Sequence, residues 1–196
     1  MKHLIITVLT ILFAIHSSAQ STGKWKIFPA YGDTQAVDSV APDCIFVLSS
    51  GNIYRVNAKD WSVTTYDKLT GLNDTGIAQI AWNSVARRLV IVYDNSNIDL
   101  MTKDGDVTNV PDLYHKSTTL DKSINGIDVF AQYAYISTAF GIVKLDVRNS
   151  LISDSYILNK SILQTSIKDG SIYAKAKNGS IMKASLSSNL VDRTQW

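Results

Sequence analysis

Four segments of the chain share one pattern, and their regular spacing constrains the fold more than any other feature of the sequence. In each, an apolar or alternating run meets a turn of small or amide residues and resumes with isoleucine, as in two antiparallel strands joined by a tight turn. The segments are Cys44–Val56, Leu89–Met101, Ala134–Leu145 and Ser171–Lys183. Their isoleucines are residues 53, 98, 142 and 181, at intervals of 45, 44 and 39 residues. Repeats of this length predict one β-propeller blade per unit.

Further strands are expected on both sides of each hairpin. First strands are predicted at Ala36–Val40, Ile77–Trp82, Ile124–Phe130 and Ile162–Ile167. Fourth strands are predicted at Trp61–Tyr66, Val107–Val110 and Leu151–Leu158, each preceded by Asp, Asn or Gly turn residues. The sequence therefore predicts an all-β propeller over residues 20–196, with about four blades of four antiparallel strands. The blades lie near 34–66, 76–110, 123–158 and 161–196, and the first strands line the channel.

Two questions about the architecture stay open at this point. The same strands could build a two-sheet β-sandwich, although four aligned units favour the propeller. Residues 25–29 resemble the start of the strand at Trp61–Tyr66, so we expect them to be a closing outer strand. That strand could complete a four-bladed ring, or the chain could be the opening part of a larger propeller. We favour an incomplete, open propeller, because the connection 107–121 is too irregular for a minimal symmetric ring.

The N-terminus has the features of an export signal. A basic start at Lys2 precedes the apolar run Leu4–Ile15, and small residues follow up to Ala19. This run is too short to span a bilayer, which takes about 20 residues. We therefore predict a signal peptide over residues 1–19 and an exported product in the periplasm or on the outer cell surface, with no transmembrane anchor. Cys44, the single cysteine, has no partner for an internal disulfide.

Composition argues against several function classes. All 17 acidic residues are aspartates and the net charge is only +2, so there is no excess of clustered cations for nucleic acid. His115 is the only histidine beyond the predicted signal, which argues against a His-ligated metal. Asp94–Asp99 and Lys103–Asp106 are rich in oxygen ligands but do not match a calcium loop. We predict no catalytic residues, metal or cofactor, although a pair of aspartates could serve a glycosidase.

Propeller geometry indicates where binding residues would gather. The turns between second and third strands share one face with the connections between blades. The candidate ligand-binding residues on this face are Asn73, Asp74, Asn95, Asn97, Phe140 and Asn178. Amides, an aspartate and an aromatic ring suit sugar hydroxyls and ring faces, yet the same residues suit ordinary turns. Trp82 and Tyr93 are interpreted as packing residues between blades.

Parts of the sequence resemble known propellers. Thr65–Ile80 is similar to the repeat of the two-component-regulator propellers, with its Tyr, Gly-Leu and apolar strand. The segments Trp25–Tyr31, Ile80–Trp82, Leu89–Leu100 and Phe140–Lys144 resemble the N-terminal propeller of PorZ-like proteins. Members of that family are large exported proteins with further propeller and C-terminal domains. The resemblance thus implies that this chain is a fragment or a shortened relative.

The resemblance also implies a role at the outer surface of a Gram-negative envelope. PorZ-like proteins act with type IX secretion in attaching cargo to lipopolysaccharide, and no catalytic residue carries over. We therefore expect a non-enzymatic exported domain that recognises a protein of the envelope or secretion apparatus, or a glycan such as lipopolysaccharide. The alternatives are a periplasmic glycan-sensing propeller, a glycan-cleaving envelope enzyme, or a truncated product without function.

Overall fold

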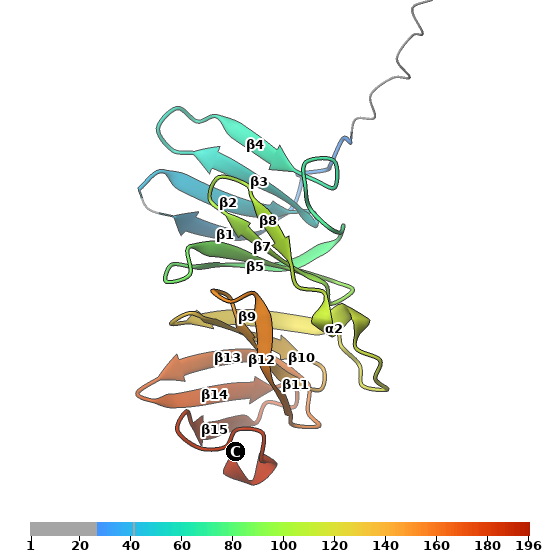
Figure 1. Ribbon diagram of the computed structural model, residues 1–196, viewed down its shortest axis with the longest axis vertical. Helices are drawn as coiled ribbons and strands as arrows, with labels where there is room; N and C mark the ends of the chain where they lie inside the picture. Colours follow the sequence, from blue (N-terminus) through green and yellow to red (C-terminus); the bar gives the residue numbers. More distant parts are fainter. Residues whose placement is uncertain (1–26, 41) are drawn as a thin grey trace, which may run out of the picture.

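The chain folds into four separate antiparallel sheets (Figure 1). A computed structural model of the protein describes residues 27–40 and 42–196. The first sheet is formed by β1 (Thr34–Val40), β2 (Cys44–Ser49), β3 (Asn52–Asn57) and β4 (Val63–Tyr66). The second is formed by β5 (Ile77–Asn83), β6 (Arg88–Tyr93), β7 (Ile98–Thr102) and β8 (Val107–Asn109).

The second half of the chain repeats this plan. The third sheet is formed by β9 (Ile124–Phe130), β10 (Tyr133–Thr138), β11 (Gly141–Asp146) and β12 (Leu151–Ile157). The fourth is formed by β13 (Ile162–Lys168), β14 (Ser171–Ala176) and β15 (Ile181–Ser185). The sheets follow one another in chain order, with the first and the last at opposite ends of the molecule (Figure 1). The prediction of an all-β, incomplete propeller is confirmed.

Local turn chemistry explains the register of the hairpins. The two-residue turns Ser50–Gly51 and Asp169–Gly170 have positive φ at both positions, as a type I′ turn requires. This turn matches the right-handed twist of the strands that it joins. β2 and β3 therefore pair without a shift along their whole length.

One hydrophobic core lies between each pair of neighbouring sheets. Ile53 belongs to the core between the first and second sheets, Ile98 to the next, and Ile142 to the core between the third and fourth. All three are 0% exposed, whereas Ile181 of the last repeat is 70% exposed. The repeat isoleucine is therefore buried wherever another sheet packs against the sheet that carries it. Among the described residues, no further sheet covers the face that carries Ile181.

The innermost strands of neighbouring sheets approach closely. β1, β5, β9 and β13 lie side by side in that order. At Gly126 in β9, a Cβ atom would stand 2.7 Å from the carbonyl oxygen of Leu163 in β13. Only glycine allows the two backbones to lie this near each other.

The fourth sheet departs from the four-stranded prediction, because it has three strands. After β15 the chain turns back and ends in a 3₁₀ helix, η1 (Arg193–Gln195). The indole N–H of Trp196 donates to the carbonyl oxygen of Leu190 at 2.9 Å, and its ring lies 6.0 Å from that of Tyr156. Leu190 and Trp196 thus pack onto the core between the third and fourth sheets. Up to residue 196, the chain after β15 makes this apolar contact and forms no further strand.

The N-terminal predictions fall largely outside the described residues. The predicted signal peptide, residues 1–19, lies there entirely, as do residues 25 and 26 of the expected closing strand. Residues 27–29 form no strand. The residues that follow contact the first sheet instead, because the Asn52 side chain donates to the carbonyl oxygen of Ala30 at 3.2 Å and the Tyr31 ring stands 5.0 Å from Tyr54.

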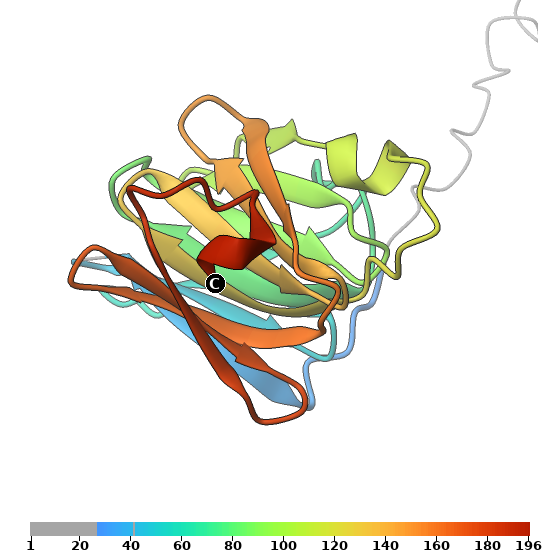
Figure 2. The same ribbon diagram turned by 90° about the horizontal axis from the view of Figure 1, so that it is seen from below.

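The structure places a single turn of helix, α2 (Asp112–His115), in the irregular connection between β8 and β9. A view along the series of sheets shows α2 at the periphery of the molecule (Figure 2). Within the described ranges, no helix has both the length and the apolar character needed to cross a membrane.

Candidate functional site

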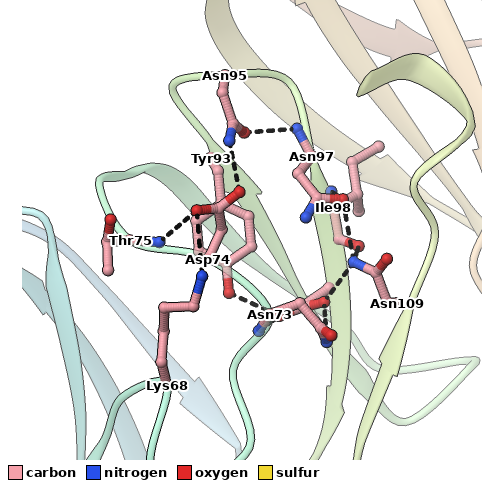
Figure 3. A network of polar contacts seen from close by, with 10 residues as sticks. Lys68, Asn73, Asp74, Thr75, Tyr93, Asn95, Asn97, Ile98 and Asn109 are labelled. Atoms are coloured by element: carbon pink, nitrogen blue, oxygen red, sulfur yellow. Dashed lines mark hydrogen bonds and ion pairs between the residues drawn. The ribbon is translucent and has the colours of Figure 1, made fainter. Parts of the chain in front are cut away.

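Four of the six predicted binding residues come together at one end of the second sheet (Figure 3). Asn73 and Asp74 lie in the connection between β4 and β5, and Asn95 and Asn97 lie in the turn between β6 and β7. The prediction that the connections between blades meet the turns between second and third strands is therefore correct for this part of the molecule.

The buried Asp99 on β7 holds this cluster together through hydrogen bonds. It is fully buried, and its carboxylate accepts four hydrogen bonds. Two come from the backbone and side-chain amides of Asn73, both at 2.9 Å. The others come from the Tyr93 hydroxyl at 2.6 Å and the Asn109 amide at 2.8 Å. A buried carboxylate without such donors would be very costly, so these bonds fix the connection at Asn73 onto the sheet.

The same carboxylate affects its neighbour Tyr93. Burial raises the pKa of the Tyr93 phenol well above its usual value, and the hydrogen bond to Asp99 raises it further. The phenol therefore stays protonated and acts as a permanent donor to Asp99. This arrangement is structural, because the Tyr93 ring is fully buried in the core between the first and second sheets.

Asp74 forms the outer half of the network. Its carboxylate accepts hydrogen bonds from the Asn95 side chain and from the backbone N–H of Thr75 at 3.0 Å, and the Lys68 ammonium stands 3.8 Å away. Burial acts to raise the pKa of Asp74, but these hydrogen bonds and the charge of Lys68 outweigh it and lower that pKa. Asp74 thus carries a negative charge at neutral pH, at a partly exposed position.

Asn97 serves the interior of the network. Its side-chain oxygen accepts from the backbone N–H of Ile98 and from the Asn109 amide, both at 3.0 Å. The Asn95 side-chain oxygen accepts from the backbone N–H of Asn97 at 2.9 Å. Asn97 is buried, while Asn73 is exposed and Asn95 is partly exposed. These bonds stiffen the turn, and part of the outer surface of the cluster stays open to a partner.

The other two predicted residues lie elsewhere. Phe140 is only 7% exposed and belongs to the core between the second and third sheets, so its ring is not presented to a ligand at the surface. The apolar run that continues through Gly141 to Ile142 and Val143 is the signal for this burial. Asn178 is exposed in the turn between β14 and β15, where its side-chain oxygen accepts from the Ser180 backbone at 3.1 Å.

A pocket that the sequence reasoning missed lies at the opposite ends of the strands. It has a volume of about 750 Å³ and opens between the first and second sheets. Its lining includes Trp82, Arg87, Arg88 and Lys103. The sequence analysis interprets Trp82 as a packing residue only. The pair Arg87 and Arg88 after β5 is the one sequence feature that could have indicated this pocket.

A smaller pocket of about 360 Å³ lies between the third sheet and the chain after β15. Lys144 and Asp154 face each other across β11 and β12 with 3.7 Å between their charged atoms. The Lys144 ammonium stands 4.2 Å from the centre of the Tyr133 ring. The Lys144 charge is thus already balanced by Asp154 and by the ring within the protein.

Histidine and cysteine, the side chains most typical of metal centres, are rare in this sequence. No three His, Cys or Asp side chains gather among the described residues in a way that could hold a metal ion. His115 lies in α2. Cys44 is partly exposed, and burial raises the pKa of its thiol, which disfavours the reactive thiolate.

Comparisons with known proteins place the fold in context. Residues 45–196 match the family described as the TSS9, PorZ, N-terminal beta-propeller domain. No curated protein matches the chain. Among solved structures, PorZ of Porphyromonas gingivalis, described as an essential bacterial surface component of the type-IX secretion system, is 27% identical with a TM-score of 0.80. The alignment covers 89% of this chain and 23% of PorZ.

Two further structures share the fold at lower identity. The extracellular domain of the putative one component system BT4673 from B. thetaiotaomicron is 17% identical with a TM-score of 0.64, and 80% of this chain aligns with 23% of that one. The computationally designed Ika4 protein is 11% identical with a TM-score of 0.62, and the alignment covers 84% of this chain and 99% of Ika4. The chain thus spans less than a quarter of the two natural proteins.

Proposed function

The chain belongs to the family of PorZ N-terminal β-propeller domains, and we propose that it is a non-enzymatic recognition domain for a protein partner at a Gram-negative envelope. The partner is a component of a type IX secretion apparatus, by analogy with PorZ, which is a surface component of that system. The predicted signal peptide, residues 1–19, would export the domain to the periplasm or the cell surface.

The observation that carries this proposal is the polar network around Asp99. Its hydrogen bonds hold the connection at Asn73 and the turn at Asn95 in one fixed arrangement. Asn73, Asp94 and Thr75 stay exposed on the outer side of this arrangement. We call the connection at Asn73–Thr75 together with the turn at Asp94–Asn97 the polar rim. Because this rim is already ordered, it loses little conformational entropy when it binds a partner, which favours recognition.

The chemistry of the same residues favours binding over catalysis. Asp74 and Asp99 accept hydrogen bonds from amides and a phenol, and the pKa of Asp74 is lowered rather than raised. A glycosidase acid needs a carboxyl group with a raised pKa, opposite a second carboxylate across the scissile bond. The aspartates of this rim therefore suit a fixed polar surface better than a glycan-cleaving pair.

The proposal is tested by direct binding of the exported chain, residues 20–196. Individually purified type IX secretion components of the source bacterium are immobilised, and binding is followed by interferometry, with purified lipopolysaccharide as a parallel surface. We expect saturable binding to one protein component. We also expect Asp94→Lys, at the rim, to weaken it by about tenfold or more.

The matched control is Asp104→Lys, which makes the same charge change in the exposed turn between β7 and β8. It should leave binding unchanged, because that turn lies at the other ends of the strands. Binding to lipopolysaccharide alone would favour the glycan-sensing alternative. Release of new reducing ends from the glycan would overturn the non-enzymatic proposal.

A further inference from the structure

We infer that the pocket between the first and second sheets binds a carboxylate attached to a bulky apolar group. The pocket is formed by residues of the β1–β2, β5–β6 and β7–β8 turns, at the strand ends opposite to the rim described above. Its volume of about 750 Å³ falls in the range of small-molecule sites. The inference goes beyond the proposed function and does not depend on it.

One wall of the pocket is apolar and fixed in place. The Trp82 ring stacks on Phe46 with 6.1 Å between ring centres and 23° between planes. Phe46 is fully buried, so it supports Trp82 from the side of the core. The backbone N–H of Trp82 donates to Asp38 at 2.6 Å, which ties β5 to β1 at this height. Val40 and Pro42 also belong to the apolar part of the lining.

The pocket lining also carries a surplus of positive charge. Arg87, Arg88 and Lys103 belong to it, together with two aspartates. Both aspartates already have cations as partners, because Lys59 pairs with Asp43 and Lys103 pairs with Asp104 at 2.9 Å.

The two arginines keep their charge uncompensated. Arg88 donates to the neutral hydroxyl of Ser150 at 2.6 Å, and no ion pair in residues 27–40 and 42–196 includes Arg87 or Arg88. The Arg87 guanidinium thus lacks a carboxylate partner at the pocket, whereas the Arg88 guanidinium extends to the third sheet, where Ser150 lies in the turn between β11 and β12.

The position of Arg87 supports a ligand-binding role. Its φ of 56° lies in the left-handed region, where Gly or Asn would fit at lower cost. The turn itself is held by the Asn83 side chain, whose oxygen accepts from the Ala86 backbone at 2.8 Å and whose amide donates to the Tyr133 carbonyl at 3.2 Å. These contacts fix the backbone from which the exposed Arg87 side chain extends beside the pocket.

These features select the class of ligand. A guanidinium group recognises a carboxylate or phosphate through paired N–H donors. A single unpaired guanidinium balances one negative charge, which suits a carboxylate better than a doubly charged phosphate. Trp82 offers its ring to an aromatic or branched aliphatic group. An apolar amino acid with a free carboxylate has this chemistry, either alone or as the last residue of a peptide.

Isothermal titration calorimetry on residues 20–196 tests the inference with defined probes. N-acetyl-L-phenylalanine should bind, and its uncharged amide should bind about tenfold more weakly or not at all. A five-residue peptide that ends in phenylalanine with a free carboxylate distinguishes the sources. Tighter binding of the peptide identifies a protein C-terminus, and equal binding identifies a free acid. Equal affinity for the acid and its amide would overturn the inference.

The arginine is tested by Arg87→Gly, because glycine accepts the φ of this position and the variant should fold at least as stably. We expect about tenfold weaker binding of N-acetyl-L-phenylalanine. Arg148→Ala removes an arginine outside the pocket and serves as the control. Wild-type affinity in Arg87→Gly would contradict the inference. Asp94→Lys should leave this affinity unchanged, so failure here is distinguishable from failure of the proposed recognition role.

Discussion

Asp99 determines how the second sheet presents its loops. The residue stands on β7, directly after the repeat isoleucine Ile98, and its side chain is fully buried without a basic partner. Its charge is stabilised by hydrogen-bond donors from three residues, Asn73, Tyr93 and Asn109. A single substitution at this position therefore disturbs two connections that are distant in sequence.

The first prediction concerns this carboxylate. Asp99→Ala leaves the donors of Asn73, Tyr93 and Asn109 without their acceptor, so we expect the free energy of unfolding to fall by about 2–4 kcal/mol. Asp94→Ala removes an exposed aspartate from the same part of the sheet and should cost less than about 0.5 kcal/mol. Urea denaturation followed by circular dichroism measures both. Similar losses for the two variants would contradict the role given to Asp99.

The second prediction concerns pH. The pKa of Asp74 is lowered in the folded protein, because hydrogen bonds from Asn95 and Thr75 and the Lys68 charge outweigh the effect of burial. Its contribution to stability is therefore complete above the usual pKa of 3.8 and is lost as the pH falls through the lower folded value. Asp74→Asn should destabilise the protein at pH 7 and lose most of this effect at about pH 2. A destabilisation that stays constant between these two pH values would contradict this assignment.

Propeller geometry was enough to predict that Asn73, Asp74, Asn95 and Asn97 lie on one face. Turn chemistry could not decide whether an amide faces outward or bonds to its own turn, because both uses favour the same residue types. Phe140 was placed on the rim by its position in a turn, while its contacts with the second sheet bury it. The arginine pair at 87 and 88 was passed over, since charged residues in turns are ordinary.

At the scale of the strands and turns, the repeat isoleucines show that an equivalent position in two blades can be buried in one and exposed in the other. Ile142 and Ile181 both stand at the third strand of their sheets, β11 and β15. Ile142 is covered by the fourth sheet, and Ile181 faces away from all sheets of the described chain. The periodic pattern predicts which strand carries the residue, and the neighbouring sheet determines its burial.

The third prediction uses this pair. Ile142→Ala opens a cavity in the core between the third and fourth sheets and should lower the free energy of unfolding by about 3 kcal/mol. Ile181→Ala, at the equivalent position of the next repeat, should cost less than about 0.5 kcal/mol. Thermal and urea unfolding of the two variants provide the measurement. Equal losses would show that Ile181 is covered in solution.

The fourth prediction concerns the turn that enters β11. Gly141 has a φ of 151°, and a Cβ atom there would stand only 2.0 Å from the carbonyl oxygen of Tyr156 on β12. Gly141→Ala must therefore separate β11 from β12, and we expect a loss of about 3 kcal/mol. Gly170→Ala has open space around the new methyl group and should cost only about 1 kcal/mol of backbone strain. If Gly141→Ala proves as mild as Gly170→Ala, the close approach of the two strands is wrong.

The strands themselves were largely predictable, because apolar runs and turn residues alternate regularly up to β15. The end of the last repeat was not. Leu190 and Trp196 pack onto the core beside Tyr156, a tertiary contact that the periodicity of the strands does not indicate. The local sequence pattern does not determine whether apolar residues extend a strand or pack onto a core, because both arrangements bury the same side chains.

At the scale of the whole molecule, the fold is a series of sheets in which each shares a core with the next. The polar rim and the pocket beside Trp82 lie at opposite ends of the strands. The molecule therefore offers two separate surfaces, a polar one formed by ordered loops and a recessed one with apolar and cationic walls. Such a division allows a partner and a small carboxylate to bind at the same time.

Both surfaces exist only if the four sheets pack face to face in chain order, as the blades of a propeller do. Methyl NOE spectroscopy on residues 20–196 tests this arrangement most directly. We expect NOEs from Leu48 and Ile53 to Ile91, and from Ile142 to Ile172, because each pair shares one core. We expect none between Ile53 and Ile172, which belong to the first and fourth sheets. Strong NOEs between Ile53 and Ile172, as in a two-layer sandwich, would contradict the propeller arrangement.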